Sequence, residues 1–251
     1  MLFCGLLAVP ARALAQADEV QVYDGGIAPR GVFNLTIHNN WIAKGVTTPA
    51  FPGGVTPDRS LNGVPEWAVG VTRWFEAGLY LPLYTWDRHR GWGLDGFKLR
   101  TLVAVPNGGE RRFVYGLGTE FSYNARQWDT TRITSEFRPI VGWHLKNKVD
   151  VIVNPILDTA YDGLKNMEFV PSGRIAYNRS ESRAYALEFY SAFGPLHGFL
   201  QVGQQSHQVF AVINHVTRSG LEIEAGAGVG LNSHSERVTF KLILSRDLNR
   251  R

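Results

Sequence analysis

The sequence is poor in cysteine, in charged residues and in long apolar runs. It has 251 residues and a single cysteine, Cys4, so its fold cannot depend on a disulfide framework. Charged residues make up 19% of the chain, below the roughly 25% of an average soluble domain. No run of 18 or more apolar residues occurs, which excludes a helical membrane span. With 12% aromatic residues and 27 glycines, what remains is an all-β protein, either a soluble barrel or sandwich or a membrane barrel.

Basic residues are scattered along the chain. Lys and Arg number 26 against 22 Asp and Glu, and no basic run exceeds two residues, as at Arg111-Arg112 and Arg250-Arg251. Nucleic-acid-binding proteins carry a basic stripe or cluster. We therefore expect no nucleic-acid partner.

Residues 1–17 have the features of an export signal. Residues 2–9 form a short apolar stretch, Pro10 ends it, and residues 13–15 (Ala-Leu-Ala) are a small-residue cleavage motif, with 15–17 (Ala-Gln-Ala) as an equal second choice. No basic residue precedes the apolar stretch, and the alternative is a buried N-terminal strand. We predict a signal peptide over 1–17, which contains Cys4, and one barrel domain over 18–251.

Stretches of about ten residues with alternating polarity recur, each followed by a turn-forming cluster. In residues 238–245 the apolar side chains Val, Phe, Leu and Leu alternate with Thr, Lys and Ser, with Ile243 as the exception. A period of two is typical of a strand with two different faces. Twelve strands are predicted: 31–42, 63–72, 75–84, 93–104, 111–123, 131–143, 148–158, 166–177, 183–193, 206–216, 220–230 and 236–246.

Two features conflict with a simple reading of these segments. Four prolines fall inside them, where each removes a ladder hydrogen bond unless it lies at a bulge or rim. These prolines are Pro82, Pro139, Pro155 and Pro171. The segment 206–216 is the least regular, because it carries apolar residues on both faces.

The connections alternate between long and short. About 20 residues follow the first segment, a tight turn follows the second, and the pattern continues along the chain. In a closed up-and-down sheet, odd and even connections lie at opposite ends. Outer-membrane barrels have short periplasmic turns and longer outer loops. Loop lengths, an even strand number and the export signal together predict a closed antiparallel transmembrane barrel of about 12 strands.

The polar faces of the strands suit an enclosed lumen better than a solvated surface. Each strand carries only one or two charges on this face, separated by Gly, Ala, Ser and Thr, and both signs occur. Charges in a confined interior must pair, because unpaired buried charge is costly. The alternative is an ordinary solvated face of a soluble barrel. The predicted lumen-lining residues are Glu66, Lys98, Arg100, Glu120, Glu136, Arg138, Asp150, Glu168, Arg174, Glu188, Glu222, Glu224 and Lys241.

The tryptophans fall mostly at strand ends or in adjoining turns. Indole rings prefer the headgroup level of a membrane, where the ring is in an apolar environment and the N–H is hydrated. The alternative is that these rings cap a soluble core. The predicted interface aromatics are Trp41, Trp67, Trp74, Trp86, Trp92, Trp128 and Trp143.

One segment carries a family resemblance. Pro65–Pro82 (PEWAVGVTRWFEAGLYLP) resembles a hairpin of Gram-negative outer-membrane proteins, the transporter barrels linked by name to the meta pathway of phenol degradation. In those proteins a strand ends in G-(V/L)-T and the next reads E-x-G-L-x-L-P. Gly91–Arg100 looks like their following strand, which opens G-x-G-D, except that Leu94 places Asp95 one residue late. The resemblance implies a barrel in the outer membrane and a transport role.

Enzymatic chemistry has weaker support in the sequence. Some outer-membrane barrels are lipid hydrolases with a Ser and a His on the outer wall, and the candidates here are Ser206-His207 and His234-Ser235. Adjacent residues point to opposite faces of a strand, so neither dipeptide forms a nucleophile–base pair by itself. His215 and Ser235 could meet across strands.

Metal and nucleotide chemistry have no support in the spacing. The seven histidines show no H-x-x-x-H or H-x-H spacing. The glycines at 226, 228 and 230 lie on an alternating strand rather than at a strand-to-helix turn, and small inward residues that make room in a lumen explain them better. We expect no metal and no cofactor.

These observations together predict a barrel in the outer membrane, with lipid and an unknown small solute as its partners. The function we expect is a narrow channel or transporter whose selectivity is set by the lumen charges. The alternatives are a plugged barrel that serves as a structural or surface-binding module, and a lipid hydrolase.

Overall fold

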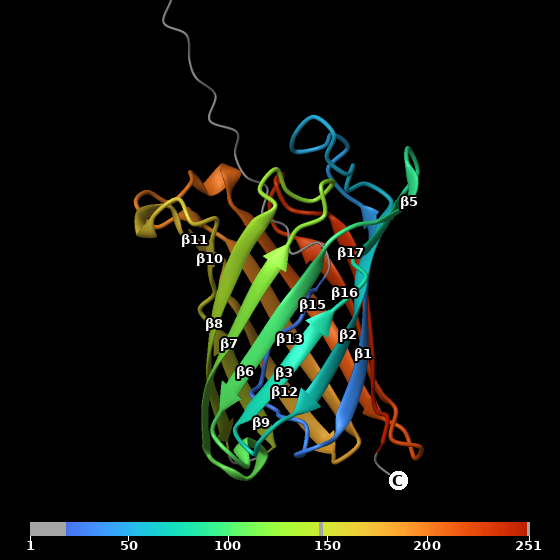
Figure 1. Cartoon of the computed structure of the whole chain (residues 1–251), viewed down its shortest axis with the longest axis vertical. Coiled ribbons are helices and arrows are strands. Elements are labelled where there is room, and N and C mark those ends of the chain that lie inside the picture. Colours follow the sequence, from blue (N-terminus) through green and yellow to red (C-terminus); the bar gives the residue numbers. More distant parts are fainter. Residues whose placement is uncertain (1–18, 146–147, 250–251) are drawn as a thin grey trace, which may run out of the picture.

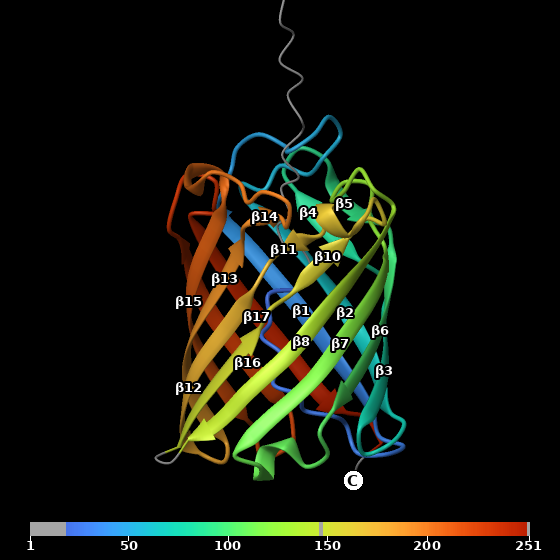
Figure 2. The same cartoon turned by 90° about the vertical axis from the view of Figure 1, so that its left-hand side faces the viewer.

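The structure, a computed structural model, describes residues 19–145 and 148–249 as one closed antiparallel barrel (Figures 1 and 2). The predicted signal peptide and Cys4 lie outside the described residues. The strands are β1 (Phe33–Lys44), β2 (Ser60–Gly70), β3 (Phe75–Tyr80), β4 (Tyr84–Asp87), β5 (Gly91–Leu94), β6 (Phe97–Ala104), β7 (Phe113–Tyr123), β8 (Ile133–Leu145), β9 (Val149–Asn154), β10 (Leu157–Thr159), β11 (Glu168–Phe169), β12 (Ser172–Ser180), β13 (Arg183–Ala192), β14 (Gly194–Pro195), β15 (Ser206–Val216), β16 (Glu222–Gly230) and β17 (Val238–Asp247). Three 3-10 turns complete the regular structure: η1 (Gly108–Glu110), η2 (Leu164–Asn166) and η3 (Val202–Gln204).

These strands form twelve passes of the wall, which confirms the predicted twelve-stranded barrel. Five passes are made of two pieces: β3 with β4, β5 with β6, β9 with β10, β11 with β12, and β13 with β14. Three of the four conflicting prolines lie at such interruptions, Pro82 before β4, Pro155 before β10 and Pro171 before β12. Pro139 stays inside β8, paired in register with Leu117 of β7.

The barrel is closed by the first and last strands. β1 pairs with β17 from Asn34↔Asp247 to Lys44↔Val238, and its other edge pairs with β2. Closure matters because an exposed N–H or C=O has no partner in hydrocarbon. The long connections lie at one end of the barrel and the short turns at the other, and β1 begins and β17 ends at the short-turn end (Figure 1).

A bulge reverses the faces of one pass. Between Tyr80 and Tyr84 the chain advances four residues, while the partners on β2 run from Glu66 to Gly63, only three residues. A shift of one residue moves each later side chain to the other face. The neighbouring pass is interrupted at the same level, at Asp95 and Gly96, where Gly96 adopts φ +89°. The late position of Asp95, noted in the sequence, therefore belongs to a paired change of register.

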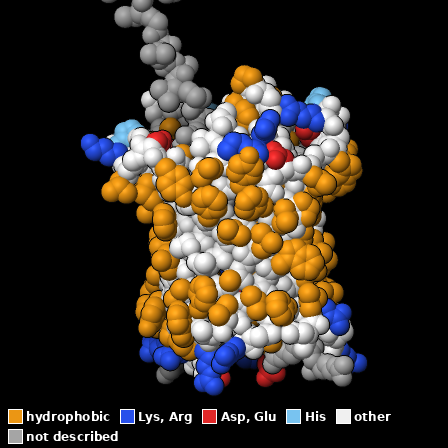
Figure 3. Space-filling model, in the orientation of Figure 1, with side chains coloured by type: hydrophobic (Ala, Val, Ile, Leu, Met, Phe, Trp, Pro, Cys, Tyr) orange, Lys and Arg blue, Asp and Glu red, His pale blue; other side chains and the backbone are white. Residues whose placement is uncertain are grey.

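The outer wall is apolar. The space-filling view shows hydrophobic side chains over most of the barrel and charged side chains gathered at its two ends (Figure 3). In β12 and β13 the outward row is Ile175, Tyr177, Tyr185, Leu187 and Phe189, and all five are exposed. Such a surface suits contact with lipid. None of the described helices is long and apolar enough to cross a membrane.

A cysteine pair tests the closing register. Ile37 and Leu244 are direct partners across β1 and β17, so their Cα atoms should lie within the range that a disulfide bridges. The double substitution Ile37→Cys/Leu244→Cys should oxidise readily and give a covalently closed chain with altered mobility on a denaturing, non-reducing gel.

The control pair is Ile37→Cys/Leu242→Cys, which is two residues out of register because Leu242 faces Asn39. At a diagonal separation of about 7–8 Å it should oxidise much more slowly. Equal oxidation of the two pairs would contradict the observed closure.

Candidate functional site

The chain before β1 runs inside the barrel. Figure 2 shows this coil crossing the interior. Asn154 of β9, which is fully buried, holds Tyr23 by both backbone groups: it accepts from the Tyr23 N–H at 2.7 Å and donates to the Tyr23 carbonyl at 2.9 Å. Arg138 donates to the carbonyl of Gln21 at 3.0 Å, and Lys241 to that of Val20 at 3.1 Å. The wall therefore satisfies backbone groups of this segment that a sheet would otherwise pair.

The Tyr23 side chain is held by three residues of the wall. Its hydroxyl lies 2.6 Å from the hydroxyl of Tyr80. The guanidinium of Arg138 lies 4.2 Å from the ring centroid, and that of Arg100 lies 5.5 Å from it. Both distances fall within the range of cation–π attraction. The aromatic ring therefore sits between two cations near the middle of the lumen.

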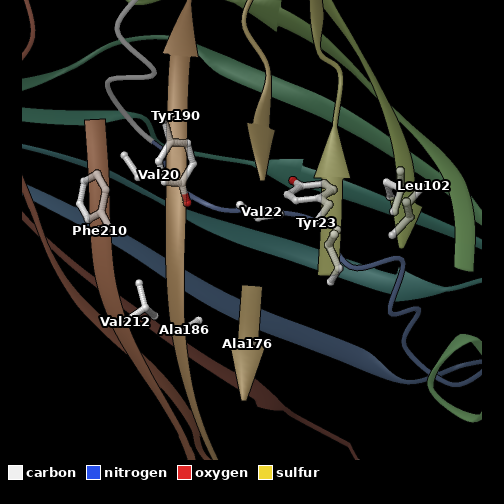
Figure 4. Packing of buried hydrophobic residues seen from close by; sticks show 11 residues of the cluster. Val20, Val22, Tyr23, Leu102, Ala176, Ala186, Tyr190, Phe210 and Val212 are labelled. Atoms are coloured by element: carbon white, nitrogen blue, oxygen red, sulfur yellow. The ribbon is translucent and has the colours of Figure 1, made fainter. Parts of the chain in front are cut away.

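An apolar cluster covers the same segment. Val20, Val22 and Tyr23 pack with inward-facing residues that include Tyr190, Phe210 and Val212 (Figure 4). This contact explains why the predicted strand 206–216 is apolar on both faces, because its outer row meets lipid and its inner row meets the inserted segment.

Glycine provides the space for this cluster. A Cβ at Gly228 would lie 2.5 Å from the Phe210 ring, so the small residue makes room for the aromatic side chain. The inner surface of the barrel is therefore partly apolar, which the prediction of a charge-lined lumen did not include.

One ion-pair group surrounds Arg100. Its guanidinium nitrogen lies 2.5 Å from a carboxylate oxygen of Glu66 and 2.5 Å from one of Glu76. His38 lies 3.3 Å from the second oxygen of Glu66. All four residues are buried. Glu76 also accepts the N–H of Ala28 at 2.6 Å, so this group pairs its acids with Arg100 and also holds the inserted segment.

A second group surrounds Lys241. Its ammonium lies 2.5 Å from Glu188 and 2.6 Å from Glu224. Arg174 pairs with the same two glutamates, and Tyr190 donates to Glu188 at 2.6 Å. Lys241 and Glu188 are fully enclosed. Two cations and two acids from four strands, β12, β13, β16 and β17, thus pair with one another, as buried charges require.

The other predicted lumen residues form smaller groups. Lys98 lies 3.4 Å from Glu120, and Arg138 lies 2.5 Å from Glu136. Asp150 contacts His144 at 2.6 Å.

The two remaining predicted acids are Glu222 and Glu168. Glu222 borders the short-turn opening of the lumen. Glu168 on β11 is the register partner of Asp158 on β10, and Asp158 is also the register partner of Glu136 on β8.

Two cavities lie on either side of the inserted segment. The upper chamber, at the long-loop end, has a volume of about 430 Å³ and a mostly apolar lining that includes Ile42, Phe51, Trp128 and Leu200. Glu236 is its one charged lining residue within the described chain. The lower chamber, at the short-turn end, has about 550 Å³.

The lower chamber is acidic. Seven carboxylates and two guanidinium groups line it: Asp24, Glu66, Glu76, Asp150, Glu222, Glu224 and Asp247, with Arg100 and Arg174. The buried ion pairs and the apolar cluster lie between the two chambers.

Six of the seven predicted interface tryptophans lie on outward rows or in turns. Trp67, Trp74, Trp92 and Trp143 are exposed, and the rings of Trp41 and Trp86 lie 6.1 Å apart. Trp128 is different: its indole packs on Val64, Tyr80 and Leu83, and its N–H donates to the hydroxyl of the buried Thr85. The expectation of a membrane-interface position was wrong for this residue, because its loop folds over the lumen and brings the ring inside.

The histidines and serines considered for hydrolysis do not form a complete catalytic site. Ser235 accepts the backbone N–H of His207 and donates to Asn232, both at 2.7 Å. His207 instead contacts the Ser191 hydroxyl at 2.9 Å and the side-chain amide oxygen of Gln205 at 3.0 Å. Acyl transfer also needs donors for the oxyanion.

The backbone N–H groups of Ser191 and His207 are already hydrogen-bonded and so are not free to stabilise an oxyanion. The N–H of Ser191 donates to the carbonyl of Pro171, and the N–H of His207 donates to the hydroxyl of Ser235. His215 contacts the backbone of Ser182 rather than Ser235. The Ser191–His207 pair, directly opposed across two strands, therefore fits a structural cross-strand hydrogen bond.

The sequence analysis missed the inserted segment and the residues that hold it. Asn154, Tyr80 and Glu76 were not singled out, because a single amide, phenol or acid in a strand carries no pattern of its own. A signal was present in the apolar residues on otherwise polar rows, such as Leu102, Ile140 and Phe210. Such residues need a partner inside the lumen.

The closed sheet, the apolar outer wall and the enclosed ion pairs define the class: this is a transmembrane β-barrel of the bacterial outer-membrane type. No protein-family model and no curated protein sequence matches the chain.

Solved structures do match it. An outer membrane channel from Pseudomonas putida F1 superposes with a TM-score of 0.62 at 12% identity, over 92% of this chain and 100% of that chain. The NanC porin gives 0.56 at 7% identity, over 85% and 100%. The KdgM porin, solved in complex with disordered oligogalacturonate, gives 0.53 at 7% identity, over 86% and 99%. At these identities the likeness shows a shared fold.

The Lys241 group provides a test of the buried network. The substitution Lys241→Met removes the cation between Glu188 and Glu224 and should lower the free energy of unfolding by about 3–5 kcal/mol, because uncompensated acids remain buried. Urea unfolding in lipid vesicles measures the loss. The double variant Lys241→Met/Glu188→Gln should recover part of it. Loss of stability in the double variant equal to or greater than that in the single variant would contradict the pairing.

Glu236 predicts a pH dependence at the long-loop end. Burial raises the pKa of Glu236 to about 7, although the carboxylate accepts the N–H of Val46 at 2.9 Å. The pKa of an unfolded glutamate is about 4.5. Between pH 4.5 and about pH 7, Glu236 is therefore protonated in the folded state and ionised in the unfolded state. The free energy of unfolding falls as the pH rises through this range.

Glu236→Gln keeps the acceptor and removes the charge, so its thermal midpoint should exceed that of the wild type at pH 8 and match it at pH 4.5. The exposed Glu181→Gln at the other end is the matched control and should show no such difference. A pH-independent difference for Glu236→Gln would rule out the titration.

Proposed function

We propose that the protein is an outer-membrane channel for small solutes, closed in its middle by the segment that precedes β1. The observation that carries this proposal is the pair of chambers at opposite ends of the lumen, with Val20–Tyr23 and the ion pairs between them. Displacement of residues 20–23, which belong to no strand of the sheet, would join the two chambers. The shared fold with channels and porins supports the proposal.

The two chambers favour different solute chemistries. The upper chamber offers apolar walls with amides and hydroxyls, including Asn40, Asn62, Gln127 and Gln208, which suits an uncharged solute with an apolar body. The acidic lower chamber should repel anions and attract cations. A polyanion such as the oligogalacturonate of the KdgM porin would therefore be a poor solute for this chain.

The hairpin Pro65–Pro82 supports a narrower assignment. Its resemblance to the transporter barrels linked by name to the meta pathway of phenol degradation favours a transport role for this barrel too. An uncharged solute with an apolar body would be compatible with that group. The alternative is a permanently plugged barrel, which the extensive anchoring of the segment favours.

Single-channel recording separates these two functions. In planar bilayers the wild type should conduct weakly, and Asn154→Ala should increase conductance or open time several-fold, because it frees both backbone groups of Tyr23. The matched control is Asn178→Ala, which removes a lumen amide that contacts Asp150 and not the segment.

In a salt gradient the reversal potential should indicate preference for cations, given the acidic lower chamber. If neither the wild type nor Asn154→Ala showed any conductance, the channel function would be refuted and the plugged barrel would be supported. An effect of Asn178→Ala equal to that of Asn154→Ala would show that the segment does not control passage.

A further inference from the structure

Exposed basic residues form a ring at the short-turn end of the barrel, and exposed acids outside the lumen are few there. At the short-turn end nine basic residues are exposed: Arg30, Arg73, Arg111, Arg112, Lys148, Arg179, Arg183, Arg218 and Arg246. Outside the lumen the exposed acids of the described chain at this end are Glu110 and Glu181. We call these nine residues the basic collar. Blue side chains are visible along the lower margin of the barrel (Figure 3).

The long-loop end also exposes more basic than acidic side chains, but half-buried acids lie beside some of its cations. Of its eight basic residues seven are exposed, whereas Asp162 is the one exposed acid among the described residues there; Asp58, Asp95 and Asp129 are half-buried. Some of them pair directly, as Arg132 does with Asp95 at 2.7 Å. No ion pair to a described residue is found for any member of the collar. The collar therefore presents eight guanidinium groups and the Lys148 ammonium, whose charge no described acid neutralises.

The collar lies next to the lipid-facing surface. Arg179 follows Tyr177 by two residues on β12, and Arg183 precedes Tyr185 by two residues on β13, so each shares the outward row of an exposed aromatic. Two residues of strand span about 7 Å along the chain. With strand tilt, this places the guanidinium groups one step beyond aromatic rings of the kind that lie at the headgroup level.

The same adjacency recurs in two turns. Arg73 precedes the exposed Trp74, and Arg112 precedes Phe113, whose ring lies 5.6 Å from that of Trp143. Aromatic rings at the interface followed by unpaired arginines match the depth order of a phospholipid, in which the glycerol region is followed by the phosphate. Arginine binds phosphate through two parallel hydrogen bonds.

We propose that the basic collar binds the phosphate groups of anionic phospholipids in the membrane leaflet at the short-turn end. The apolar wall of the barrel continues directly into the collar, so the acyl chains and the headgroup of one lipid would contact both. This inference rests on the position of the barrel in a membrane and not on conduction through it. It stands or falls separately from the proposed channel.

The test compares two lipids with the same acyl chains, phosphatidylglycerol and phosphatidylcholine, added to the detergent-solubilised full chain. The readout is the temperature at which the compact barrel is lost on a gel. Phosphatidylglycerol should raise this temperature above the phosphatidylcholine value by about 5 °C or more. The triple variant Arg112→Gln/Arg183→Gln/Arg218→Gln should lose most of that difference while keeping its midpoint in phosphatidylcholine.

The matched control removes the same charge at the other end. Arg88→Gln/Arg126→Gln/Arg237→Gln changes three exposed arginines of the long-loop end and should keep the full phosphatidylglycerol effect. Equal loss in both triple variants, or no difference between the lipids in the wild type, would overturn the proposal. An equal rise with inorganic phosphate alone would also overturn it, because it would assign the collar to a soluble anion instead of a lipid. Native mass spectrometry, counting phosphatidylglycerol molecules retained by each variant, gives a second readout.

Discussion

The whole structure depends on the need to pair every backbone amide of a wall that faces hydrocarbon. Pairing of β1 with β17 removes the last open edges. Once the sheet is closed, alternation divides each strand into a row for lipid and a row for the interior. The apolar outer wall and the enclosed charges are two consequences of that one constraint.

The interior row faces a second constraint, since charge enclosed in a narrow lumen must be neutralised nearby. Arg100 and Lys241 each bridge two acids contributed by different strands, and each group also reaches the inserted segment, through Glu76 and through the Lys241 ammonium itself. The wall and the segment are thus stabilised by the same contacts. Displacing the segment would change the environment of those ions, so the position of the segment and the electrostatics of the lumen depend on each other.

The fold was predictable because alternation and loop length are regular properties that accumulate over many residues. All twelve predicted segments coincide with passes of the wall, and 206–216 matches β15 at both ends. The interruptions were partly visible in Pro82, Pro155 and Pro171. The inward-facing charged residues could be predicted from the alternation of each strand. Their ion-pair partners could not be predicted, because pairing depends on which strands approach one another across the lumen.

Two features of the interior escaped prediction for a related reason. The course of residues 19–31 is set by contacts with many separate strands, none of which leaves a local pattern. Trp128 has the sequence position of an interface residue, yet its loop carries the ring to Val64 and Tyr80. Both cases depend on tertiary contacts made by non-regular backbone.

The matched interruption of two neighbouring passes, at Tyr80–Tyr84 and at Asp95–Gly96, restricts how this rim can change over evolutionary time. A single-residue deletion in one pass would invert the inside and outside of every position above it, while its neighbour kept the old orientation. Lineages that lengthen or shorten this hairpin should therefore do so in both passes together, and the two positions should mutate as a linked pair.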